Sequence, residues 1–391
     1  MPENTHTEVT TQSWGSRLGG AFKGILFGFV LIGIGIWLLF WNEGRAVRRA
    51  RALTEGAGVV VSVAAGQVGP ANEGKLVHLS GQADTFDILR DDAFGVAERA
   101  IHLERTAEMY QWREHSDSKT EKKLGGGTET RTTYSYSQDW SSSVISSTGF
   151  NQPQGHENPS TMPYQGSKSS AREVSIGPFR MSPGLIGSMS RDEPLPIDSA
   201  DNLPGDLRWR ARAHNGGIYI GRSPSSPQIG DIRVFFKVVR PALVSVVAQQ
   251  VGSGLGPYAT SNGGTIQLLS HGAVAADAMF EGAQQANRFT TWIFRLLGFL
   301  LVSFGLKRLF RPLTVMADVV PAIGNMAEAV SGFVAYLLAA FLSLIVVAVA
   351  WFYHRPVLAV ILLLIAGAVA VFSGIGIAKV LKRKKQQIAS A

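Results

Sequence analysis

The sequence predicts a membrane protein with four transmembrane α-helices, one N-terminal and three C-terminal, and a large, mainly β (α+β) extramembrane domain. Long apolar runs without charges lie near both ends of the 391-residue chain. The middle lacks such runs and instead alternates apolar and polar residues, as half-buried strands do. Cysteine is absent, so neither disulfides nor thiolate ligands hold this domain together, and packing must do so.

The first span is residues 24–41, which carry no charge and end in the interfacial aromatic residues Trp37 and Trp41. An A-x-A sequence at 50–52 has the form of a signal-peptidase site. The apolar run is too long for a signal peptide, however, and arginines precede the site. We therefore expect a retained signal anchor.

The C-terminal spans are less uniform. Residues 333–352 and 357–378 each reach the roughly 20 residues that cross a bilayer, and the tight loop between them predicts a helical hairpin. Residues 289–306 form a weaker span because they contain Arg295. A charge within a span is costly unless its side chain snorkels to the interface or faces other helices. We expect 289–306 to cross fully, with an interfacial position as the alternative.

Four spans place both termini on one side of the membrane. With the termini cytoplasmic, the inner segments 1–23, 307–332 and 379–391 carry ten Lys and Arg, against six in the outer segments near the membrane. Positive residues favour the cytoplasmic side, so the domain of residues 42–288 is predicted to be extracytoplasmic. Residues 312–328 are too polar to span and form either an interfacial helix or a simple loop.

The exit of the first span opposes this orientation, because it carries four arginines, namely Arg45, Arg48, Arg49 and Arg51. Long domains translocate regardless of such charges. On a helix the first three lie roughly on one side, where they can contact lipid headgroups. Each cation near an anionic surface contributes about 1 kcal/mol. The alternative is a plain solvated helix end.

The extramembrane domain contains a series of β-like segments. Alternating or β-branched runs predict strands at 58–65, 74–82, 99–114, 130–142, 231–240, 241–251 and 264–272. Turn-forming composition predicts a hairpin tip or flexible loop at 116–129, an irregular segment at 151–170 and a long connection with a short helix at 182–206. Helical composition returns at 273–294 and runs into the second span.

The charge balance excludes a nucleic-acid-binding surface as the source of the net charge of +8. Residues 42–288 contain 25 basic and 25 acidic residues, and the excess lies beside the apolar runs. This placement indicates membrane topology rather than contact with a polynucleotide.

Motifs for catalysis, cofactors or metals are absent from the sequence. The chain lacks phosphate-binding glycine loops, a nucleophile elbow and histidines at metal-ligand spacing. We therefore expect no catalytic, cofactor-binding or metal-binding residues and no cofactor. The alternative is a periplasmic-face enzyme or sensor that uses the irregular loop around His156 and Glu157.

Two further patterns, one of aromatic residues and one of glycines, indicate where strands or helices contact other surfaces. Aromatic residues alternate along two predicted strands, where they form a cross-strand ladder or a surface for carbohydrate, lipid or protein; they are Tyr110, Trp112, Tyr134, Tyr136 and Trp140. Gly20, Gly24 and Gly28 recur every four residues at the first span. This spacing permits close helix packing, within one chain or between chains.

Seven segments resemble, in order, the transmembrane protein 43 (LUMA) family and its prokaryotic relatives. They are FWNEGRA (40–46), NEGKLVH (72–78), EMYQW (108–112), YSYSQDW (134–140), GHENPSTM (155–162), GDIRVFF (230–236) and WFYHRP (351–356). They extend over nearly the whole chain. The motif residues that become candidates for contacts are Asn42, Glu43, Gly44, Tyr110, Trp112, Tyr136, Trp140, His156, Asn158 and Pro159.

The resemblance implies a four-span protein with a large non-cytosolic domain between the first two helices, and animal members in the endoplasmic reticulum and inner nuclear membrane. This chain has no glycosylation sequon and no cysteine, so a bacterial inner membrane with a periplasmic domain is expected instead. We expect a non-catalytic scaffold or adaptor that self-associates and organises membrane protein partners. A channel or transporter is the weakest alternative, because Arg295 is the only charged residue within the four predicted spans.

Overall fold

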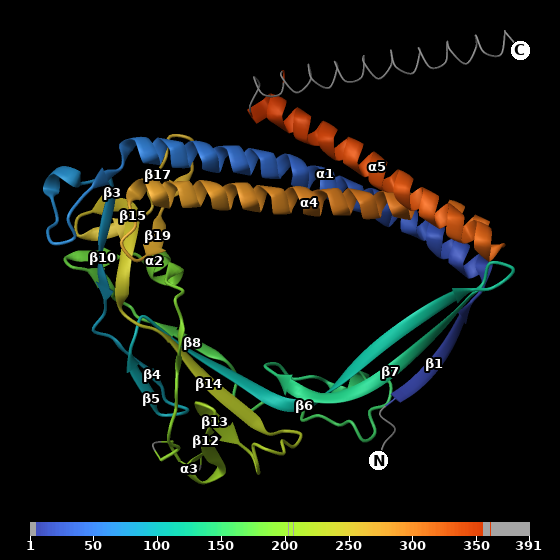
Figure 1. Cartoon of the computed structure of the whole chain (residues 1–391), viewed down its shortest axis with the longest axis horizontal. Helices are drawn as coiled ribbons and strands as arrows, with labels where there is room; N and C mark the ends of the chain where they lie inside the picture. Colours follow the sequence, from blue (N-terminus) through green and yellow to red (C-terminus); the bar gives the residue numbers. More distant parts are fainter. Residues whose placement is uncertain (1–4, 202, 206, 355–359, 361–391) are drawn as a thin grey trace, which may run out of the picture. The chain divides into compact units, whose positions relative to one another are not determined.

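The computed structural model describes residues 5–201, 203–205, 207–354 and 360 (Figure 1). Three of its helices are long and apolar enough to cross a membrane: α1 (Trp14–Val59), α4 (Ala276–Ala317) and α5 (Pro321–His354). They contain the predicted spans 24–41, 289–306 and 333–352. The predicted fourth span, 357–378, and the basic tail, 379–391, lie outside the described residues. The membrane α+β class is therefore confirmed, with three candidate membrane helices in the part described.

The helices are longer than the predicted spans. Residues 307–332, predicted as a cytoplasmic segment with an interfacial helix or a simple loop, contain the end of α4 at Ala317, a short turn and the start of α5 at Pro321. Their side of the membrane stays a prediction. Pro321 occupies the first helical position, where a missing N–H is tolerated. Pro312 lies inside α4, whose helix continues despite the lost hydrogen bond. Within residues 42–288, the strands begin at Val61 and end at His271, and one further strand, β1 (Thr5–Gln12), precedes α1.

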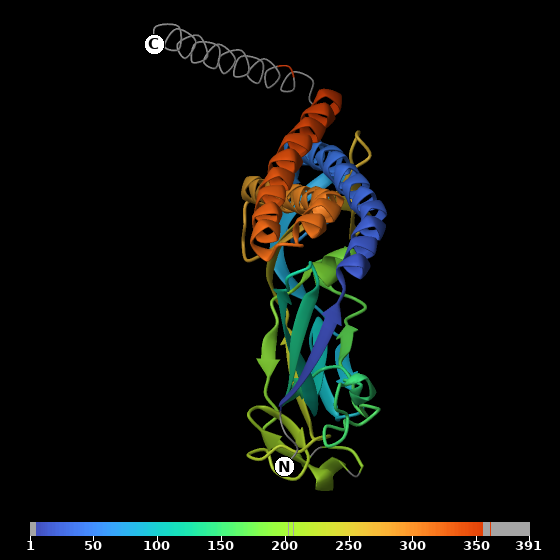
Figure 2. The same ribbon diagram turned by 90° about the vertical axis from the view of Figure 1, so that its right-hand side faces the viewer.

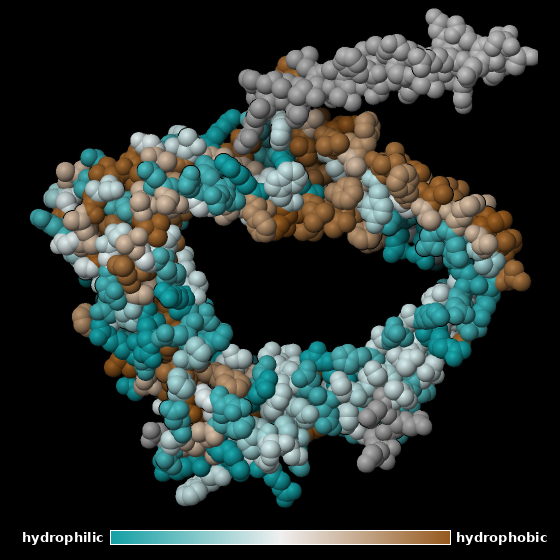
Figure 3. Space-filling model, viewed as in Figure 1, coloured by the Kyte–Doolittle hydropathy of each residue, from teal (hydrophilic) through white to brown (hydrophobic). Residues whose placement is uncertain are grey.

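The described residues form two compact units, which we call the β unit and the helical unit. The β unit comprises the described residues of 1–10, 52–121 and 129–283. The helical unit comprises those of 11–51, 122–128 and 284–391. Figure 3 shows apolar residues gathered over the long helices and polar residues over the strands.

An eight-stranded sheet forms one part of the β unit. Its strand order is β1-β7-β6-β14-β13-β12, with β11 beside β14 and β8 beside β6. In the β6–β14 pair, Ala107 lies opposite Val234, and both are fully buried. Phe94 and Phe236 pack edge to face in the same core. The strands are β1 (Thr5–Gln12), β6 (His102–Lys122), β7 (Thr128–Ser141), β8 (Ser167–Ser170), β11 (Glu193–Leu195), β12 (Ala211–His214), β13 (Gly217–Ile220) and β14 (Ile232–Val239).

A seven-stranded sheet forms the second part of the β unit, in the order β19-β15-β16-β10-β9-β3-β2. Val246 of β15 lies opposite Leu79 of β3 in its core. The end of α1 and the start of α4 also pack on this unit, through Leu53 and Phe280. The strands are β2 (Val61–Ser62), β3 (Leu76–Asp84), β9 (Ser175–Ile176), β10 (Phe179–Met181), β15 (Ala242–Val251), β16 (Gly254–Gly256) and β19 (Leu268–His271).

Shorter elements complete the β unit. Two small hairpins are formed by β4 (Ile88–Asp91) with β5 (Val96–Arg99), and by β17 (Tyr258–Ala259) with β18 (Thr265–Ile266). Two short helices lie in the long connection, α2 (Pro183–Ser188) and α3 (Leu207–Arg210). Most predicted strands are present within a few residues. The exception is 58–65, of which only Val61–Ser62 is strand, because α1 continues to Val59.

β1 is an edge strand of the eight-stranded sheet, next to β7 (Figure 2). The hydroxyls of Thr7 and Thr133 lie 3.4 Å apart, and Tyr134 OH donates to Glu8 Oε2 over 3.4 Å. The predicted segment 1–23 therefore contains a strand, and the side of the membrane on which it lies stays a prediction. The alternating run THTEVTTQ favours a strand, which the sequence analysis did not predict.

Candidate functional site

Glycines set the distance between α1 and α4, which run antiparallel side by side (Figure 1). A Cβ on Gly28 would lie 2.8 Å from the carbonyl oxygen of Gly305, and one on Gly35 would lie 2.8 Å from Cγ2 of Val302. Of the other predicted packing glycines, Gly24 would meet only the Arg308 side chain at 3.9 Å. A Cβ on Gly20 would meet no described atom of a neighbouring element within 4 Å. Close packing thus occurs at Gly28 and Gly35.

A layer of polar side chains continues this seam. Asn42 is fully buried, and its Nδ2 donates to the carbonyl oxygen of Thr291 over 3.0 Å. In return, Asn287 Nδ2 of α4 donates to the carbonyl oxygen of Ala46 over 2.9 Å. Arg45 Nη1 donates to Asn287 Oδ1 over 3.2 Å. Each side-chain amide thus donates to a backbone carbonyl of the opposite helix, which satisfies the buried polar groups.

The carboxylate of Glu43 is the charged centre of this layer. Arg295 donates to it twice, from Nε to Oε1 over 2.6 Å and from Nη2 to Oε2 over 3.0 Å. Trp351 Nε1 of α5 donates to Oε2 over 2.6 Å. The Arg295 guanidinium also lies over the rings of Trp292 and Trp351, at 4.7 and 5.6 Å from their centroids. The side chain of Arg295 therefore faces the other helices and does not snorkel to the membrane interface.

A groove of about 580 Å3 opens beside this ion pair. Its surface is almost wholly apolar, and Arg295 supplies its charged end. The lining includes Leu39, Trp292, Arg295, Phe299, Leu344 and Trp351. Pairing with Glu43 already neutralises the arginine, so the groove suits apolar chains rather than free anions.

The four arginines after the first span lie within α1 and make protein contacts. Arg45 binds α4 through Asn287, and Arg51 Nη2 donates to the carbonyl oxygen of His354 over 2.8 Å. Arg48 and Arg49 are also engaged in polar interactions. Gly44 permits close approach here, because a Cβ would lie 2.9 Å from His354 Nε2. A role of these arginines at lipid headgroups stays a prediction.

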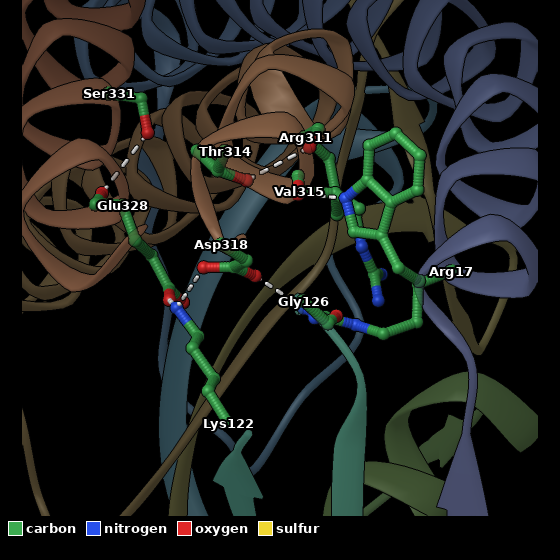
Figure 4. Close-up of polar contacts among 10 residues, drawn as sticks. Arg17, Lys122, Gly126, Arg311, Thr314, Val315, Asp318, Glu328 and Ser331 are labelled. Carbon is green, nitrogen blue, oxygen red and sulfur yellow. Dashed lines mark hydrogen bonds and ion pairs between the residues drawn. The ribbon is translucent and has the colours of Figure 1, made fainter. Parts of the chain in front are cut away.

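A second polar cluster surrounds Asp318, in the short turn between α4 and α5 (Figure 4). The side chain of Asp318 is 2% exposed and lies between two cations. Arg17 Nη2 of α1 is 2.5 Å from Oδ2, and Lys122 Nζ is 2.8 Å from Oδ1. Lys122 also pairs with Glu328 Oε2 of α5 over 2.8 Å. Burial opposes the charge on Lys122, but the ion pairs with Asp318 and Glu328 outweigh it and raise the pKa of Lys122.

Backbone contacts complete this cluster at the tip of the β6–β7 hairpin. Arg17 Nη1 donates to the carbonyl oxygen of Gly126 over 2.5 Å, and Gly125 N donates to the carbonyl oxygen of Val319 over 3.1 Å. Trp14 Nε1 donates to the carbonyl oxygen of Val315 over 2.9 Å. The Trp14 ring covers Gly126, whose φ of +81° favours glycine. We call the set Trp14, Arg17, 122–128, Val315, Asp318, Val319 and Glu328 the tip latch.

The loop around His156 is closed rather than open to substrate. His156 is fully buried; its ring stacks on Tyr136 at 3.9 Å between centroids and meets Trp112 edge to face at 4.7 Å. Its Nδ1 lies 3.0 Å from the carbonyl oxygen of Gln152, whereas Nε2 has no hydrogen-bond partner among the described residues. Glu157 is exposed. The two residues therefore do not form one open site.

Asn158 joins this loop to β6. Its Oδ1 accepts from Trp112 N over 2.7 Å, and its Nδ2 donates to the carbonyl oxygens of Trp112 and Ile145 over 2.8 and 3.1 Å. The side chain of Asn158 thus makes the two hydrogen bonds to the backbone of Trp112 that a neighbouring strand would otherwise make. Pro159 lies against Gly230, 3.5 Å from its Cβ position.

The predicted aromatic set divides into two clusters. Trp112 and Tyr136 enclose His156, as described above. Tyr110 packs on Trp140 at 5.2 Å between centroids, and the Arg233 guanidinium lies 4.5 Å from the Trp140 ring. Both clusters belong to β6 and β7 and their neighbours, so the set stabilises the sheet at these points. Its use as a contact surface stays a prediction.

The sequence analysis missed the tip latch. Asp318 and Glu328 are the only acidic residues between Lys307 and Phe333, and a carboxylate between two long apolar helices was the available signal. No local sequence pattern indicated Lys122, because its partners lie far away in the chain. Among the residues that the structure describes, no group of three His, Asp or Glu side chains is placed to hold a metal ion.

Comparison with known proteins decides the family. The model of the family described as "Transmembrane protein 43" matches residues 109–356. The chain belongs to the transmembrane protein 43 family. Transmembrane protein 43 of Rattus norvegicus is 34% identical over 371 residues, which cover 91% of this chain and 92% of the relative. The Homo sapiens protein is also 34% identical, over 93% of this chain and 92% of its own length.

The match to a more distant transmembrane protein 43 relative also extends over most of both chains. The homolog of Drosophila melanogaster is 32% identical and covers 88% of this chain and 92% of its own length. The match therefore includes both the long helices and the β unit. No solved structure matches this chain.

Proposed function

We propose that the chain is a non-catalytic, multi-pass membrane scaffold or adaptor. It self-associates and organises membrane or partner proteins through its β unit. Membership of the transmembrane protein 43 family supports a membrane protein of this architecture. The buried motif residues Asn42, Glu43 and His156 and the partly buried Asn158 support it too, because they join elements of the fold instead of lining an open site.

The observation that carries the proposal is the exposed edge of β1. Seven of its eight residues are exposed and the remaining one is partly exposed, and Val9 keeps 50% of its surface. An uncovered edge strand presents unpaired backbone N–H and C=O groups, which are a template for another strand. We propose that β1 of a second copy pairs with it and that the joined sheets form the scaffold.

The alternative of an enzyme or sensor at His156 and Glu157 receives no support from this geometry. A general acid or base must reach the substrate directly or through one water, whereas the ring of His156 is enclosed by Tyr136 and Trp112. A channel gains no support either, since the charge of Arg295 is paired with Glu43.

The cellular setting is part of the proposal. We place the protein in a bacterial inner membrane with the β unit in the periplasm. The absence of cysteine and of a glycosylation sequon supports this setting over a eukaryotic secretory compartment.

The test is the oligomeric state in lipid nanodiscs, measured by native mass spectrometry. We expect dimers or larger assemblies. Because the chain has no cysteine, Val9→Cys should form a disulfide-linked dimer under mild oxidation. Phe86→Cys, whose side chain is 91% exposed elsewhere in the β unit, is the matched control and should stay monomeric on a denaturing gel. Monomers alone in nanodiscs would contradict self-association.

A further inference from the structure

The residues around Trp209 in the β unit combine an exposed indole with positive charge. Trp209 lies in α3, and 85% of its surface is exposed, a larger fraction than for any other tryptophan of the chain. Residues 207–222 contain four arginines and no acidic residue, and Arg208 and Arg212 are exposed. Among the residues that the structure describes, neither of these two arginines forms an ion pair. We call Arg208, Trp209 and Arg212 the Trp209 corner.

The hydrophobic core fixes this corner in place from both sides, where α3 leads into β12 (Figure 1). Leu207 is 4% exposed and packs with Leu203 in the core of the eight-stranded sheet. Ala211, which begins β12, is buried and lies opposite Ile220 of β13. Trp209 stands between these buried anchors, so the fold itself holds the indole in solvent. Little conformational freedom is therefore lost when a partner binds there.

Carboxylates on neighbouring segments of the β unit are engaged by uncharged donors. Asp231 accepts from Tyr219 OH over 2.5 Å and from Gln228 N over 2.9 Å. Asp201 accepts from Ser199 Oγ over 2.6 Å. Neither carboxylate pairs with an arginine of the Trp209 corner, so the charge of these arginines is available to a ligand from outside the chain.

We propose that the Trp209 corner binds the headgroups of anionic phospholipids at a bilayer surface. Tryptophan favours the membrane–water interface, where its ring lies at the level of the headgroups and its N–H stays hydrated. Arginine donates bidentate hydrogen bonds to phosphate and is attracted to an anionic surface. The long apolar helices keep the protein in a membrane, so a bilayer is always present at high local concentration. An acidic protein segment would match the arginines but would offer the indole no apolar layer.

The test uses a polarity-sensitive fluorophore on His214→Cys in the full chain, which has no other cysteine. His214 is exposed and lies two residues after Arg212. Protein in phosphatidylcholine nanodiscs is compared with protein in nanodiscs that also contain phosphatidylglycerol, and vesicles of each composition are then added to the former. We expect phosphatidylglycerol to shift the emission to the blue in at least one of these two arms, and salt to reverse the shift. No shift in either arm, or a shift with poly-glutamate and none with phosphatidylglycerol, would overturn the proposal.

Variants on the labelled background separate the contributions of charge and ring. Arg208→Gln and Arg212→Gln should each weaken the response to phosphatidylglycerol about fivefold. Trp209→Ala should weaken it at every salt concentration, and Trp209→Phe should restore part of it. Arg90→Gln and Phe86→Ala, at exposed positions elsewhere in the β unit, are the matched controls and should leave it unchanged. Equal losses in the controls would refute a specific site. The fluorophore reports lipid contact in a monomer and in an assembly alike, so the result is independent of self-association.

Discussion

The guanidinium of Arg295 on α4 donates two hydrogen bonds to the carboxylate of Glu43 on α1, at 2.6 and 3.0 Å. Removing one partner of a buried ion pair leaves the other charge uncompensated, which typically costs about 3–5 kcal/mol. We expect Glu43→Ala to lower the free energy of unfolding by about 3 kcal/mol, since Trp351 also loses its acceptor. Thermal unfolding in nanodiscs measures the loss. Glu43→Ala with Arg295→Ala should lose less than the two single variants together; simple additivity would refute the coupling.

The glycine seam predicts a difference between two otherwise similar substitutions in α1. Gly28→Ala places a methyl group 2.8 Å from the carbonyl oxygen of Gly305 and should cost about 1–3 kcal/mol, because the helices must separate. Gly20→Ala meets no described atom within 4 Å and should be neutral or slightly stabilising, because alanine favours helix. Thermal unfolding of both variants side by side is the measurement. Equal effects would show that the seam is not closely packed.

The Asn158 bridge predicts a loss of stability when its side chain is removed. Asn158→Ala leaves two groups of Trp112 and the carbonyl oxygen of Ile145 without their partner, at a cost of about 2 kcal/mol. Chemical unfolding followed by tryptophan fluorescence should report the change. Asn151→Ala, on the exposed part of the same loop, should change stability little. A stable Asn158→Ala variant would contradict this reading of the loop.

His102 predicts the response of the β unit to acid. Burial lowers the pKa of His102, whose ring nitrogens lie 2.8 Å from Ser170 Oγ and from the carbonyl oxygen of Ile186. Below the unfolded-state pKa of about 6.5, the unfolded chain binds a proton that the folded chain resists. Stability should therefore fall as the pH drops from about 7 through 6. His102→Gln should flatten this dependence relative to the unsubstituted protein, and unchanged melting curves against pH would contradict the prediction.

The tip latch predicts where the hairpin becomes accessible. Gly125 and Gly126 both have positive φ, so alanine strains the backbone at either position. Only at position 126 would the added methyl group lie 2.2 Å from the Trp14 ring. Limited proteolysis of the hairpin tip should therefore be faster in Gly126→Ala than in Gly125→Ala. Equal cleavage rates would show that Trp14 does not cover the tip.

Much of the architecture follows from local sequence. The apolar runs predict the three described membrane helices, and alternation predicts the main strands of both sheets. The length of α1 is not predictable in this way, because polar residues such as Arg45 and Arg51 follow the apolar run and find partners on α4 and α5. The turn at Asp318 was also missed, because Pro312 is a helix breaker by propensity and yet lies inside α4.

The polar sites could be predicted only in part. The motif residues Glu43 and Asn158 were singled out, but their partners lie far along the chain, and no local pattern identifies Trp351 or Ile145. The pairing of the short strand β1 with a distant sheet was not predicted either. Long-range pairing of this kind leaves only a weak local signal.

Gly28, Gly35 and Asn42 recur every seven residues along α1, and this spacing has a consequence for how the helix pair is aligned. A shift of α1 by seven residues would bring Gly35 opposite Gly305, so the glycines alone permit two alignments. The same shift would move Glu43 by two helical turns away from Arg295 and Arg45 away from Asn287, so that these side-chain pairs would be lost. Buried polar side chains are known to define the register of packed helices. The Glu43–Arg295 and Arg45–Asn287 pairs therefore select one register from two that the glycines alone permit.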